Sequence, residues 1–206
     1  MYLKIKRMVD VILSLVGLIC LAVPLLILIV AIKVDSRGPV LFKQKRVGIN
    51  KTYFHIFKFR TMKIDTPKDT PTHLLEDPDQ YITRIGKFMR KTSLDELPQI
   101  LNIIAGQMSI IGPRPALWNQ YDLIEERDKY GANDVPPGLT GWAQISGRDE
   151  LPIDVKAKLD GEYAKKIGPW MDIRCFLGTI ASVVMSDGVV EGGTGKTKAD
   201  KDSVNK

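Results

Sequence analysis

The sequence predicts an α+β fold that has an apolar N-terminal helix in a membrane, a small β-hairpin, and surface amphipathic helices around a core. Three observations lead to this prediction. Residues 11–32 contain no charged side chain. Two segments rich in Phe, Tyr, Val and Ile, 40–44 and 52–60, flank a turn at 47–51, which is typical of a hairpin. Farther along, several segments repeat apolar residues at helical spacing, and 206 residues suffice for one domain with a core.

The composition limits the classes of partner. The formal net charge of +6 favours anionic partners such as acidic lipids or phosphorylated substrates. Nucleic acid is disfavoured, because the aromatic residues do not interleave with the basic ones as a stacking platform would require. Cys20 and Cys175 lie far apart, so the sequence contains neither a disulfide framework nor a zinc spacing. A reducing compartment is the simpler interpretation.

The apolar segment 11–32 is long enough to reach across a membrane, but Pro24 interrupts it. At about 1.5 Å per residue the segment matches a hydrocarbon core of roughly 30 Å, whereas neither limb, 11–23 or 25–32, spans it alone. Pro24 cannot donate a helical hydrogen bond, and its ring clashes with the carbonyl of Cys20. Two structures are compatible with this pattern: a kinked spanning helix, and a re-entrant helix that breaks at Pro24. Positive charge on both flanks favours the re-entrant form. These charges are Lys4, Lys6, Arg7, Lys33, Arg37, Lys43, Lys45 and Arg46.

Basic residues follow the membrane segment in two patterns. In the second predicted strand, Lys58 and Arg60 alternate with phenylalanines, so one face offers cations either to a bound phosphate or to solvent. After a proline-containing loop at 65–80, residues 81–91 have helical spacing, with apolar residues on one face and basic residues, including Arg90, elsewhere. Such a helix suits an anionic membrane surface, and it equally suits an ordinary position facing the core.

A pair of adjacent carboxylates, Asp95 and Glu96, stands between the basic segment 87–91 and a rigid turn that carries Arg114. Carboxylates flanked by cations suit a divalent metal and a phosphate ester, because each charge lowers the cost of holding the next. A purely structural interpretation is also available. Acids are favoured at helix N-termini, and Ser93 with Glu96 fits a capping box. A proline in the next turn opposes that box, whereas a cap by Asp95 avoids the conflict.

The C-terminal half contains a glycine-rich loop, 136–148, between two predicted helices. The loop includes Gln144 and ends in Arg148, and its glycines would either let a ligand approach the backbone or serve turns alone. The tail from residue 188 is rich in Gly, Lys and Asp, which is typical of a flexible segment. A third predicted helix, at 170–186, suits the membrane interface. The three predicted helices cover 118–129, 151–166 and 170–186.

Five segments, taken in order, match one family. They are Gly38-Pro39-Val40 through Lys45-Arg46-Val47-Gly48, Phe57-Lys58-Phe59-Arg60-Thr61-Met62, Ser93-Leu94-Asp95-Glu96-Leu97-Pro98, Gly112-Pro113-Arg114-Pro115, and Pro137-Gly138-Leu139-Thr140-Gly141-Trp142-Ala143-Gln144. The chain resembles the monotopic bacterial phosphoglycosyl transferases, which are polyprenyl-phosphate sugar-1-phosphate transferases, over roughly residues 1–185. Its size resembles the small stand-alone members, including the diacetylbacillosamine-phosphate transferases of N-linked protein glycosylation.

This resemblance implies a re-entrant membrane helix at 1–36, a catalytic domain at the membrane interface at 37–187 and a flexible tail at 188–206, all at the cytoplasmic face of the bacterial inner membrane. It implies Mg²⁺ and a two-step reaction, in which Asp95 attacks the β-phosphate of a UDP-sugar, releases UMP and passes the phosphosugar to polyprenyl (undecaprenyl) phosphate. UDP-N,N'-diacetylbacillosamine or a similar N-acetylated sugar is the expected donor. The reaction would be the first membrane step of glycoconjugate assembly, with later glycosyltransferases of the pathway as partners.

The resemblance also implies roles for individual side chains. Asp95 and Glu96 are the expected catalytic residues and metal ligands, with Glu96 serving either as a base or as a ligand. Family members often have a small polar residue before the breaking proline, whereas this chain has Val23. The alternative from another class is a non-enzymatic, membrane-anchored binding or scaffold protein with a basic face, in which Asp95 is a helix cap. The expected substrate-binding residues are Arg114, Arg90, Lys58, Arg60, Gln144 and Arg148.

Overall fold

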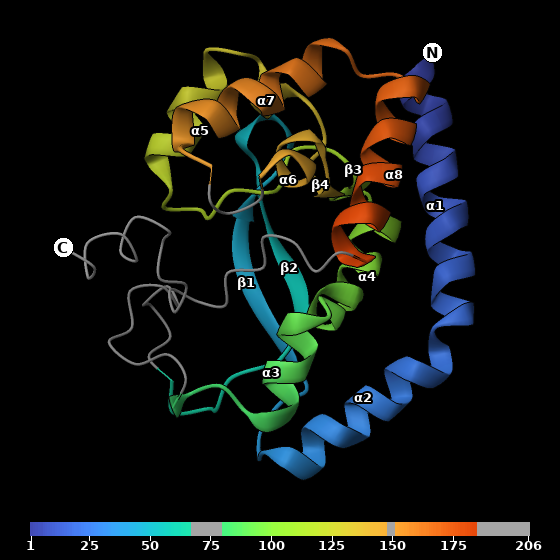
Figure 1. The fold of residues 1–206 in the computed structure, drawn as a ribbon, viewed down its shortest axis with the longest axis vertical. Coiled ribbons are helices and arrows are strands. Elements are labelled where there is room, and N and C mark those ends of the chain that lie inside the picture. Colours follow the sequence, from blue (N-terminus) through green and yellow to red (C-terminus); the bar gives the residue numbers. More distant parts are fainter. Residues whose placement is uncertain (67–79, 148–150, 185–206) are drawn as a thin grey trace, which may run out of the picture.

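A computed structural model describes residues 1–66, 80–147 and 151–184 (Figure 1). Within these residues the α+β class is confirmed, because the helices are accompanied by two small two-stranded sheets. Most of the predicted loop at 65–80 lies outside the described residues, as do Arg148 and the predicted tail from residue 188.

The N-terminal apolar segment forms two helices, α1 (Tyr2–Cys20) and α2 (Ala22–Asp35), which are bent by 63° relative to each other (Figure 1). The break lies at Leu21, whose φ of −92° and ψ of 1° are not helical, and not at Pro24. Pro24 sits in the first turn of α2, where its missing N–H has no helical partner to lose, and its ring excludes the carbonyl of Cys20 from a continuous helix. No single helix among the described residues is long and apolar enough to cross a membrane, and α1 and α2 meet that criterion only as a bent pair.

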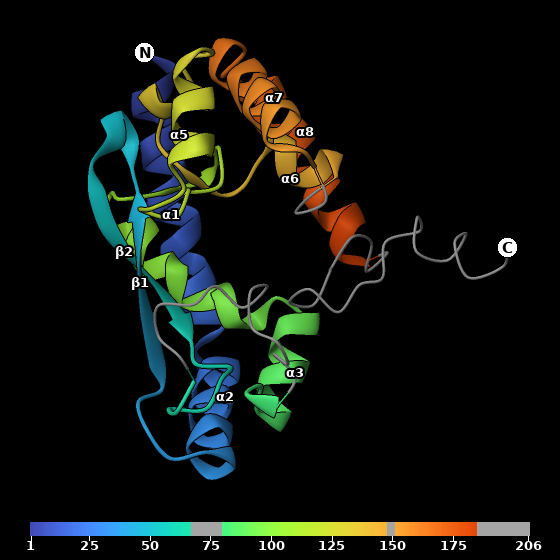
Figure 2. The same ribbon diagram turned by 90° about the vertical axis from the view of Figure 1, so that its left-hand side faces the viewer.

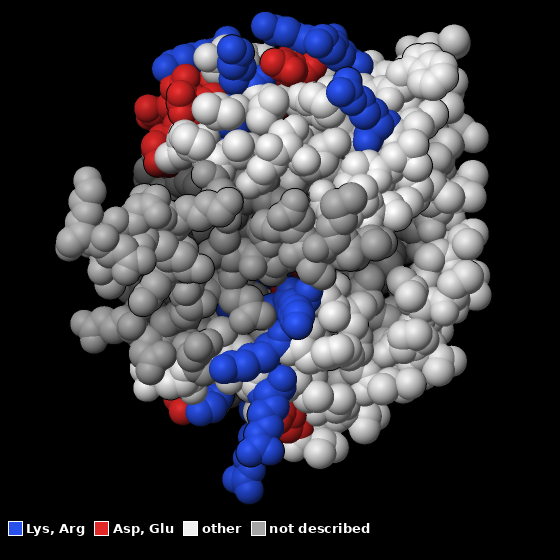
Figure 3. Space-filling view, in the orientation of Figure 1, with Lys and Arg blue, Asp and Glu red and all other residues white. Residues whose placement is uncertain are grey.

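The outward faces of α1, α2 and α8 (Pro169–Val184) carry large exposed apolar side chains. Figure 3 shows no charged side chain along its right-hand edge, where α1 lies. The inner face of α2 packs against the rest of the chain, where Leu28 and Ile32 cluster with Phe59 and Met89. The exposed set includes Ile5, Met8, Ile12 and Ile19 on α1, Val23, Ile27 and Val34 on α2, and Trp170, Phe176 and Leu177 on α8.

A polar stripe on α1 faces the protein. Lys6 and Asp10 are buried, and Lys6 Nζ lies 2.7 Å from Oδ2 of Asp172 on α8. Asp10 accepts a hydrogen bond at 2.6 Å from Oγ of Ser109, which lies on strand β3 (Ser109–Ile111). Arg7 donates to the last two carbonyls of α4 (Ile100–Ile104). Two of the charges that sequence analysis assigned to the membrane flank, Lys6 and Arg7, therefore hold α1 against the rest of the fold.

The predicted hairpin is present as β1 (Leu41–Val47) and β2 (Tyr53–Phe59), which are antiparallel with Leu41 opposite Phe59 and Val47 opposite Tyr53. A 3₁₀ turn, η1 (Ile49–Lys51), connects them, and Asn50 has a positive φ there, a conformation that asparagine tolerates. Seen from the side (Figure 2), the hairpin lies on one side of the molecule, and α6 (Trp142–Ser146), α7 (Ile153–Lys165) and α8 lie on the other.

The predicted helix at 81–91 begins at Arg84, because Thr83 caps it: Thr83 Oγ1 accepts from the Gly86 N–H at 2.9 Å. Met89 is buried against α2, so the core-facing interpretation holds for one face, and the interaction with an anionic membrane surface stays a prediction. The remaining elements are α3 (Arg84–Lys91), η4 (Leu94–Gln99), α4 (Ile100–Ile104), β3 (Ser109–Ile111), α5 (Tyr121–Asp128), η5 (Ala132–Asp134), β4 (Gly138–Thr140), α6 (Trp142–Ser146) and α7 (Ile153–Lys165).

The sequence predicted a loop at 136–148, but the described part of this glycine-rich segment is not a loop throughout. It contains β4, which pairs in parallel with β3, and then α6. Each of these elements is short, and the partner strand lies far away in the sequence, so neither produces a periodic pattern.

Candidate active site

The two carboxylates lie on η4, which follows Ser93 with its left-handed φ of 56°. Because a 3₁₀ helix has three residues per turn, Leu94 and Leu97 share a face. Both pack against the cluster around α2, which turns Asp95 and Glu96 away from the core. In the described part of the chain no side chain caps η4 or the helix α4 that follows it. The capping interpretation of this segment is therefore wrong.

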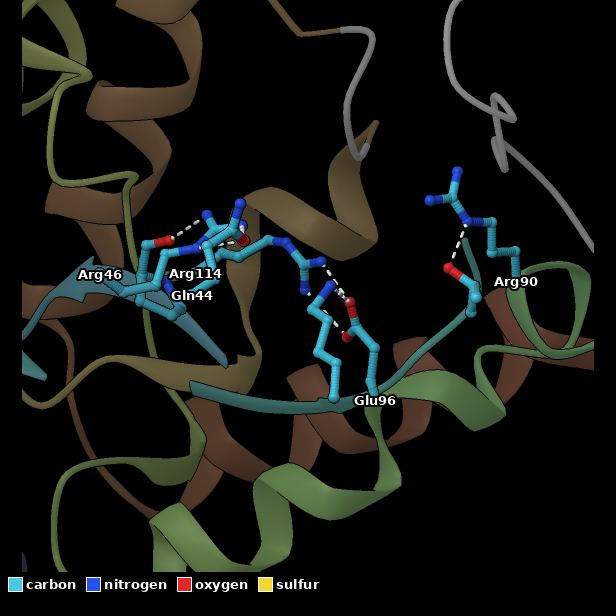
Figure 4. A network of polar contacts seen from close by, with 8 residues as sticks. Gln44, Arg46, Arg90, Glu96 and Arg114 are labelled. Atoms are coloured by element: carbon cyan, nitrogen blue, oxygen red, sulfur yellow. Dashed lines mark hydrogen bonds and ion pairs between the residues drawn. The ribbon is translucent and has the colours of Figure 1, made fainter. Parts of the chain in front are cut away.

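Glu96 is held by two cations (Figure 4). Arg114 donates from Nη1 to Oε2 at 3.1 Å and from Nη2 to Oε1 at 2.5 Å, and Lys58 Nζ lies 2.7 Å from Oε1. Bidentate, charge-assisted bonds of this kind are among the strongest in proteins. Burial alone would raise the pKa of Glu96, but Arg114 and Lys58 outweigh burial and hold the pKa well below its ordinary value.

Asp95 is half-buried, and its pKa is shifted in the opposite direction. Burial raises the pKa and the charge of Glu96 adds to the rise, whereas Lys58, Arg90 and Arg114 lower the pKa without reversing the shift. Neighbouring acids whose environments push their pKa values apart commonly have different chemical tasks. Glu96 is the fixed anion of the site, and Asp95 is the more basic carboxylate.

Arg114 stands in the turn after β3, and close packing of glycines fixes this turn. The Gly138 N–H donates to the Pro113 carbonyl at 2.9 Å. A Cβ on Gly138 would lie 2.1 Å from the nitrogen of Gly112, and a Cβ on Gly141 would lie 2.1 Å from the Gly112 carbonyl oxygen, so only glycine permits this approach. The glycines thus bring together two motifs that are separate in the sequence, the Arg114 turn and the glycine-rich segment.

The structure brings three of the predicted substrate-binding residues to the carboxylates. Lys58 extends from β2 and Arg114 from the turn after β3, and both contact Glu96. Arg90 lies on α3, donates from Nε to Thr61 Oγ1 at 2.9 Å, and in Figure 4 lies on the opposite side of Glu96 from Arg114. Its charge lowers the pKa of Asp95, which places it within electrostatic reach of that carboxylate.

The other three predicted substrate-binding residues lie elsewhere. Arg60 donates to the carbonyls of Ser36 and Arg37, at 2.8 and 2.6 Å, so its guanidinium closes the end of α2 and has a structural role. Gln144 lies on α6, where its amide nitrogen and oxygen are both buried and have no hydrogen-bond partner among the described residues. Arg148 lies outside the described residues.

The residues that support the Arg114 turn were not predicted from the sequence. Arg127 on α5 forms a buried ion pair with Asp160 on α7 and donates to the carbonyl of Arg114 at 2.9 Å. Arg46 donates to the carbonyl of Pro115 at 2.9 Å. A signal for Asp160 was present, because it falls at helical spacing on the buried face of α7, where an unpaired acid would be costly.

The donor set for a metal is small. Among the described residues no three His, Cys, Asp or Glu side chains gather at one place. Two cations already engage Glu96, which leaves the carboxylate of Asp95. Mg²⁺ is usually held by one or two carboxylates together with substrate phosphates and waters. These residues therefore fit a Mg²⁺ ion that is shared with a diphosphate.

The fold and the site define a class of protein: one with apolar helices suited to a membrane and, beside them, a carboxylate placed among cations that suit a phosphorylated ligand. The chain belongs to the bacterial sugar transferase family, whose model matches residues 1–186. This membership confirms the resemblance at the level of the family.

Individual relatives cover nearly all of this chain. An undecaprenyl-phosphate glucose phosphotransferase of Komagataeibacter xylinus is 41% identical over 191 residues, which is 88% of this chain and 36% of the relative. A UDP-N-acetylgalactosamine-undecaprenyl-phosphate N-acetylgalactosaminephosphotransferase of Aeromonas hydrophila is 33% identical over 195 residues, 91% of this chain and 45% of the relative. The uncharacterized sugar transferase EpsL of Bacillus subtilis is 36% identical over 185 residues, 90% of each chain. The chain thus spans less than half the length of the first two relatives.

Proposed function

We propose that the chain transfers a sugar 1-phosphate from a UDP-sugar to undecaprenyl phosphate or a similar polyprenyl phosphate, and releases UMP, through a covalent intermediate on Asp95. The observation that carries this proposal is the contrast between the two adjacent carboxylates. Glu96 is neutralised by Arg114 and Lys58, whereas Asp95 has a raised pKa among the same cations. The names of the K. xylinus and A. hydrophila relatives both specify undecaprenyl phosphate, which supports the acceptor.

The proposed reaction has two steps at one phosphorus atom. An oxygen of Asp95 first bonds to the β-phosphorus, and the bond from that phosphorus to the bridging oxygen breaks, so UMP leaves with the electron pair. An oxygen of polyprenyl phosphate then attacks the same phosphorus, and the bond to Asp95 breaks. This yields the polyprenyl diphosphate sugar and regenerates the carboxylate. An aspartyl phosphate is reactive enough for the second attack, and a raised pKa makes the deprotonated Asp95 a stronger nucleophile.

We assign three cationic side chains to binding the negatively charged diphosphate: Lys58, Arg90 and Arg114. They are the cations whose charges act on Asp95, and guanidinium groups suit phosphate oxygens. Asp95 would help to hold Mg²⁺, which would supply positive charge to stabilise the departing UMP. A base would need a higher pKa than that of Glu96, so we assign Glu96 to holding Arg114 and Lys58 in place. Substrate binding by Gln144 stays a prediction.

We further propose that α1 and α2 form a re-entrant helix at the cytoplasmic face of the bacterial inner membrane. The 63° bend and the exposed apolar faces of both helices support this arrangement. The ion pair between Lys6 and Asp172 supports it as well, because it ties the start of α1 to α8. A lipid-linked acceptor would then reach the site from the adjacent bilayer.

For the donor we propose an N-acetylated sugar such as diacetylbacillosamine. The sugar named for the A. hydrophila relative is N-acetylated, and the sugar named for the K. xylinus relative is glucose. These names support variation of the sugar within the family, and a panel of donors must therefore include both kinds.

The test is release of UMP from a panel of donors: UDP-N,N'-diacetylbacillosamine, UDP-N-acetylglucosamine, UDP-N-acetylgalactosamine and UDP-glucose. The protein is supplied in lipid nanodiscs with Mg²⁺ and undecaprenyl phosphate. We expect many turnovers with one N-acetylated donor, and only when the polyprenyl phosphate is present. Release of UDP would indicate transfer of the sugar without its phosphate, and a lack of any nucleotide product would support the non-enzymatic alternative.

A further inference from the structure

Arg127 connects a buried ion pair to the backbone of Arg114. Its Nε and Nη2 donate to Oδ2 of Asp160 at 2.9 and 2.5 Å, and its Nη2 also donates to the carbonyl oxygen of Arg114 at 2.9 Å. The side chains of Arg127 and Asp160 are only 5% and 1% exposed. One guanidinium therefore links α5, α7 and the turn after β3.

The rest of this turn has little freedom. Its two prolines fix their own φ angles near −65°, its glycine is packed backbone to backbone against Gly138, and Arg46 donates to the carbonyl of Pro115. Rotation about ψ of Arg114 would swing the carbonyl that Arg127 holds. The direction in which the Arg114 side chain leaves the turn thus depends on Arg127.

Stability alone does not explain a buried ion pair at this place. Removing two charges from water costs several kcal/mol per ion, and replacing such a pair with apolar residues is often neutral or stabilising. We propose that Arg127 and Asp160 are positioning residues, which hold Arg114 in register with Glu96 and the substrate phosphate. This inference rests on the proposed function, because there the alignment of Arg114 with the diphosphate matters.

Arg114 needs this support because it has two partners to satisfy. It holds Glu96 by two hydrogen bonds at once, which requires its guanidinium plane to face the carboxylate. In the proposed reaction it must also face the diphosphate. A displacement of about 1 Å in such a group can lower a rate by roughly 10²-fold.

The main test replaces the pair with apolar side chains, by combining Arg127→Met with Asp160→Leu. No unpaired charge is left, so the protein should fold with a melting temperature near that of wild type. The carbonyl of Arg114 nevertheless loses its donor. We expect kcat to fall by about tenfold or more while the KM for the UDP-sugar changes less. Should the double variant fail to fold, Arg127→Lys, which keeps the cation but loses the fork, takes its place.

Two controls separate positioning from general destabilisation. Asp160→Asn leaves the charge of Arg127 buried without a counter-ion, so the melting temperature should fall below that of the double variant. Its amide oxygen still accepts from Arg127, so kcat should fall less than in the double variant. Lys51→Met removes an exposed ion pair to Asp128, the neighbour of Arg127 in the sequence, and should change nothing, since the side chains of that pair are 53% and 43% exposed.

A coupling measurement tests whether Arg127 acts through Arg114. In an Arg114→Lys background the double replacement should lower kcat much less than in wild type, because the aligned guanidinium is already lost. Additive losses, or a folded double variant with the kcat of wild type, would overturn the proposal.

Hydrogen exchange gives a readout that does not depend on turnover. The amides of Gly112 and Gly138 donate to the carbonyls of Thr140 and Pro113, and both should exchange faster in the double variant than in Lys51→Met. Faster exchange in a protein whose wild type releases no UMP would mean that the proposed function fails and the positioning stands. Unchanged exchange would refute the positioning itself.

Discussion

At the residue scale, Asp95 and Glu96 show how two neighbouring acids acquire different properties. Burial acts on both, but Arg114 and Lys58 bind Glu96 directly and reverse the effect of burial there. At Asp95 burial prevails and the pKa is raised. The charged form of Asp95 therefore costs folding free energy, which is common at groups that a protein keeps for chemistry.

Asp95→Asn should abolish turnover without weakening the fold. A neutral amide is a poor nucleophile, so kcat should fall by about 10⁴-fold or more. Because the pKa of Asp95 is raised in the folded state, its charged form opposes folding, and the variant should melt at the same or a higher temperature at neutral pH. The difference should shrink as the pH falls through the pKa of Asp95, where the wild-type side chain also becomes neutral. A variant that melts at a lower temperature at neutral pH would contradict this account.

Arg114→Lys keeps the positive charge but loses the fork that holds Glu96. We expect kcat/KM to fall by about 10²-fold, as when one preorganised donor is removed. The depressed pKa of Glu96 contributes stability above the unfolded pKa of that residue, and this stability is lost as the pH falls through the folded pKa. In the variant this gain between acidic and neutral pH should be smaller. Thermal melts across that range measure it, with Lys51→Met as the control, and an unchanged profile would show that Arg114 does not support Glu96.

The carboxylate pair could be predicted from the sequence, but the difference between its members could not. The cations that create the difference, Lys58 and Arg114, are 38 and 18 positions away from Glu96, and no local pattern links them. For Arg60, in contrast, a local pattern led to a wrong prediction of substrate binding. It continues the alternation that begins with Lys58, but the strand ends at Phe59, so the alternating direction of side chains does not extend to Arg60.

At the element scale, three short elements depend on glycine for their approach. β3, β4 and α6 meet where the backbone of Gly138 and Gly141 contacts Gly112. This junction fixes the turn that carries Arg114, so the packing of small elements determines the geometry of the site.

Gly138→Ala should therefore lower both stability and activity. Its new Cβ would lie 2.1 Å from the nitrogen of Gly112, an atom that cannot move without shifting the strand. We expect overpacking to lower the free energy of unfolding by about 1–3 kcal/mol. The melting temperature should fall accordingly, and turnover should be lost. Gly168→Ala is the matched control, because the nearest atom to its Cβ would be 3.6 Å away. Equal melting temperatures for the two variants would show that the junction tolerates a side chain.

Two longer helices were predictable, because each extends over at least about two turns. The predicted helices at 118–129 and 151–166 correspond to α5 (Tyr121–Asp128) and α7 (Ile153–Lys165). β4 and α6 were not predictable, since a three-residue strand and a five-residue helix are too short for a repeating apolar pattern to be recognised. The position of the helix break was also displaced from Pro24, because a proline fits inside the first turn of a new helix.

At the scale of the whole molecule, the polar stripe of α1 fixes the N-terminal helix to the rest of the chain. Lys6 contacts Asp172 on α8, and Asp10 contacts Ser109 on β3. A helix that crossed the bilayer would have to expose these buried charges to lipid, which is costly. The contacts therefore favour a molecule whose first residues lie on the same side as its candidate active site.

We predict that single cysteines at residues 3 and 45, placed in a variant without Cys20 and Cys175, both react from the cytoplasmic side. A reagent that cannot cross the membrane, applied to intact cells and to inverted vesicles, makes this distinction. Lys6→Met should loosen the attachment of α1 and expose residue 3 to the opposite side in part of the population. If residue 3 of the otherwise unaltered chain reacted only from the periplasmic side, the re-entrant arrangement would be wrong.

The covalent role of Asp95 is tested most directly by a single turnover without a lipid acceptor. Protein in detergent is mixed with Mg²⁺ and the UDP-sugar that supports UMP release, and the peptide containing residue 95 is then analysed by mass spectrometry. We predict release of about one UMP per protein, the mass of one phosphosugar on that peptide, and loss of the adduct when polyprenyl phosphate is added. Asp95→Asn should give neither the UMP nor the adduct. Multiple turnovers with lipid, but no adduct and no UMP without it, would contradict the covalent mechanism and indicate direct transfer from donor to acceptor.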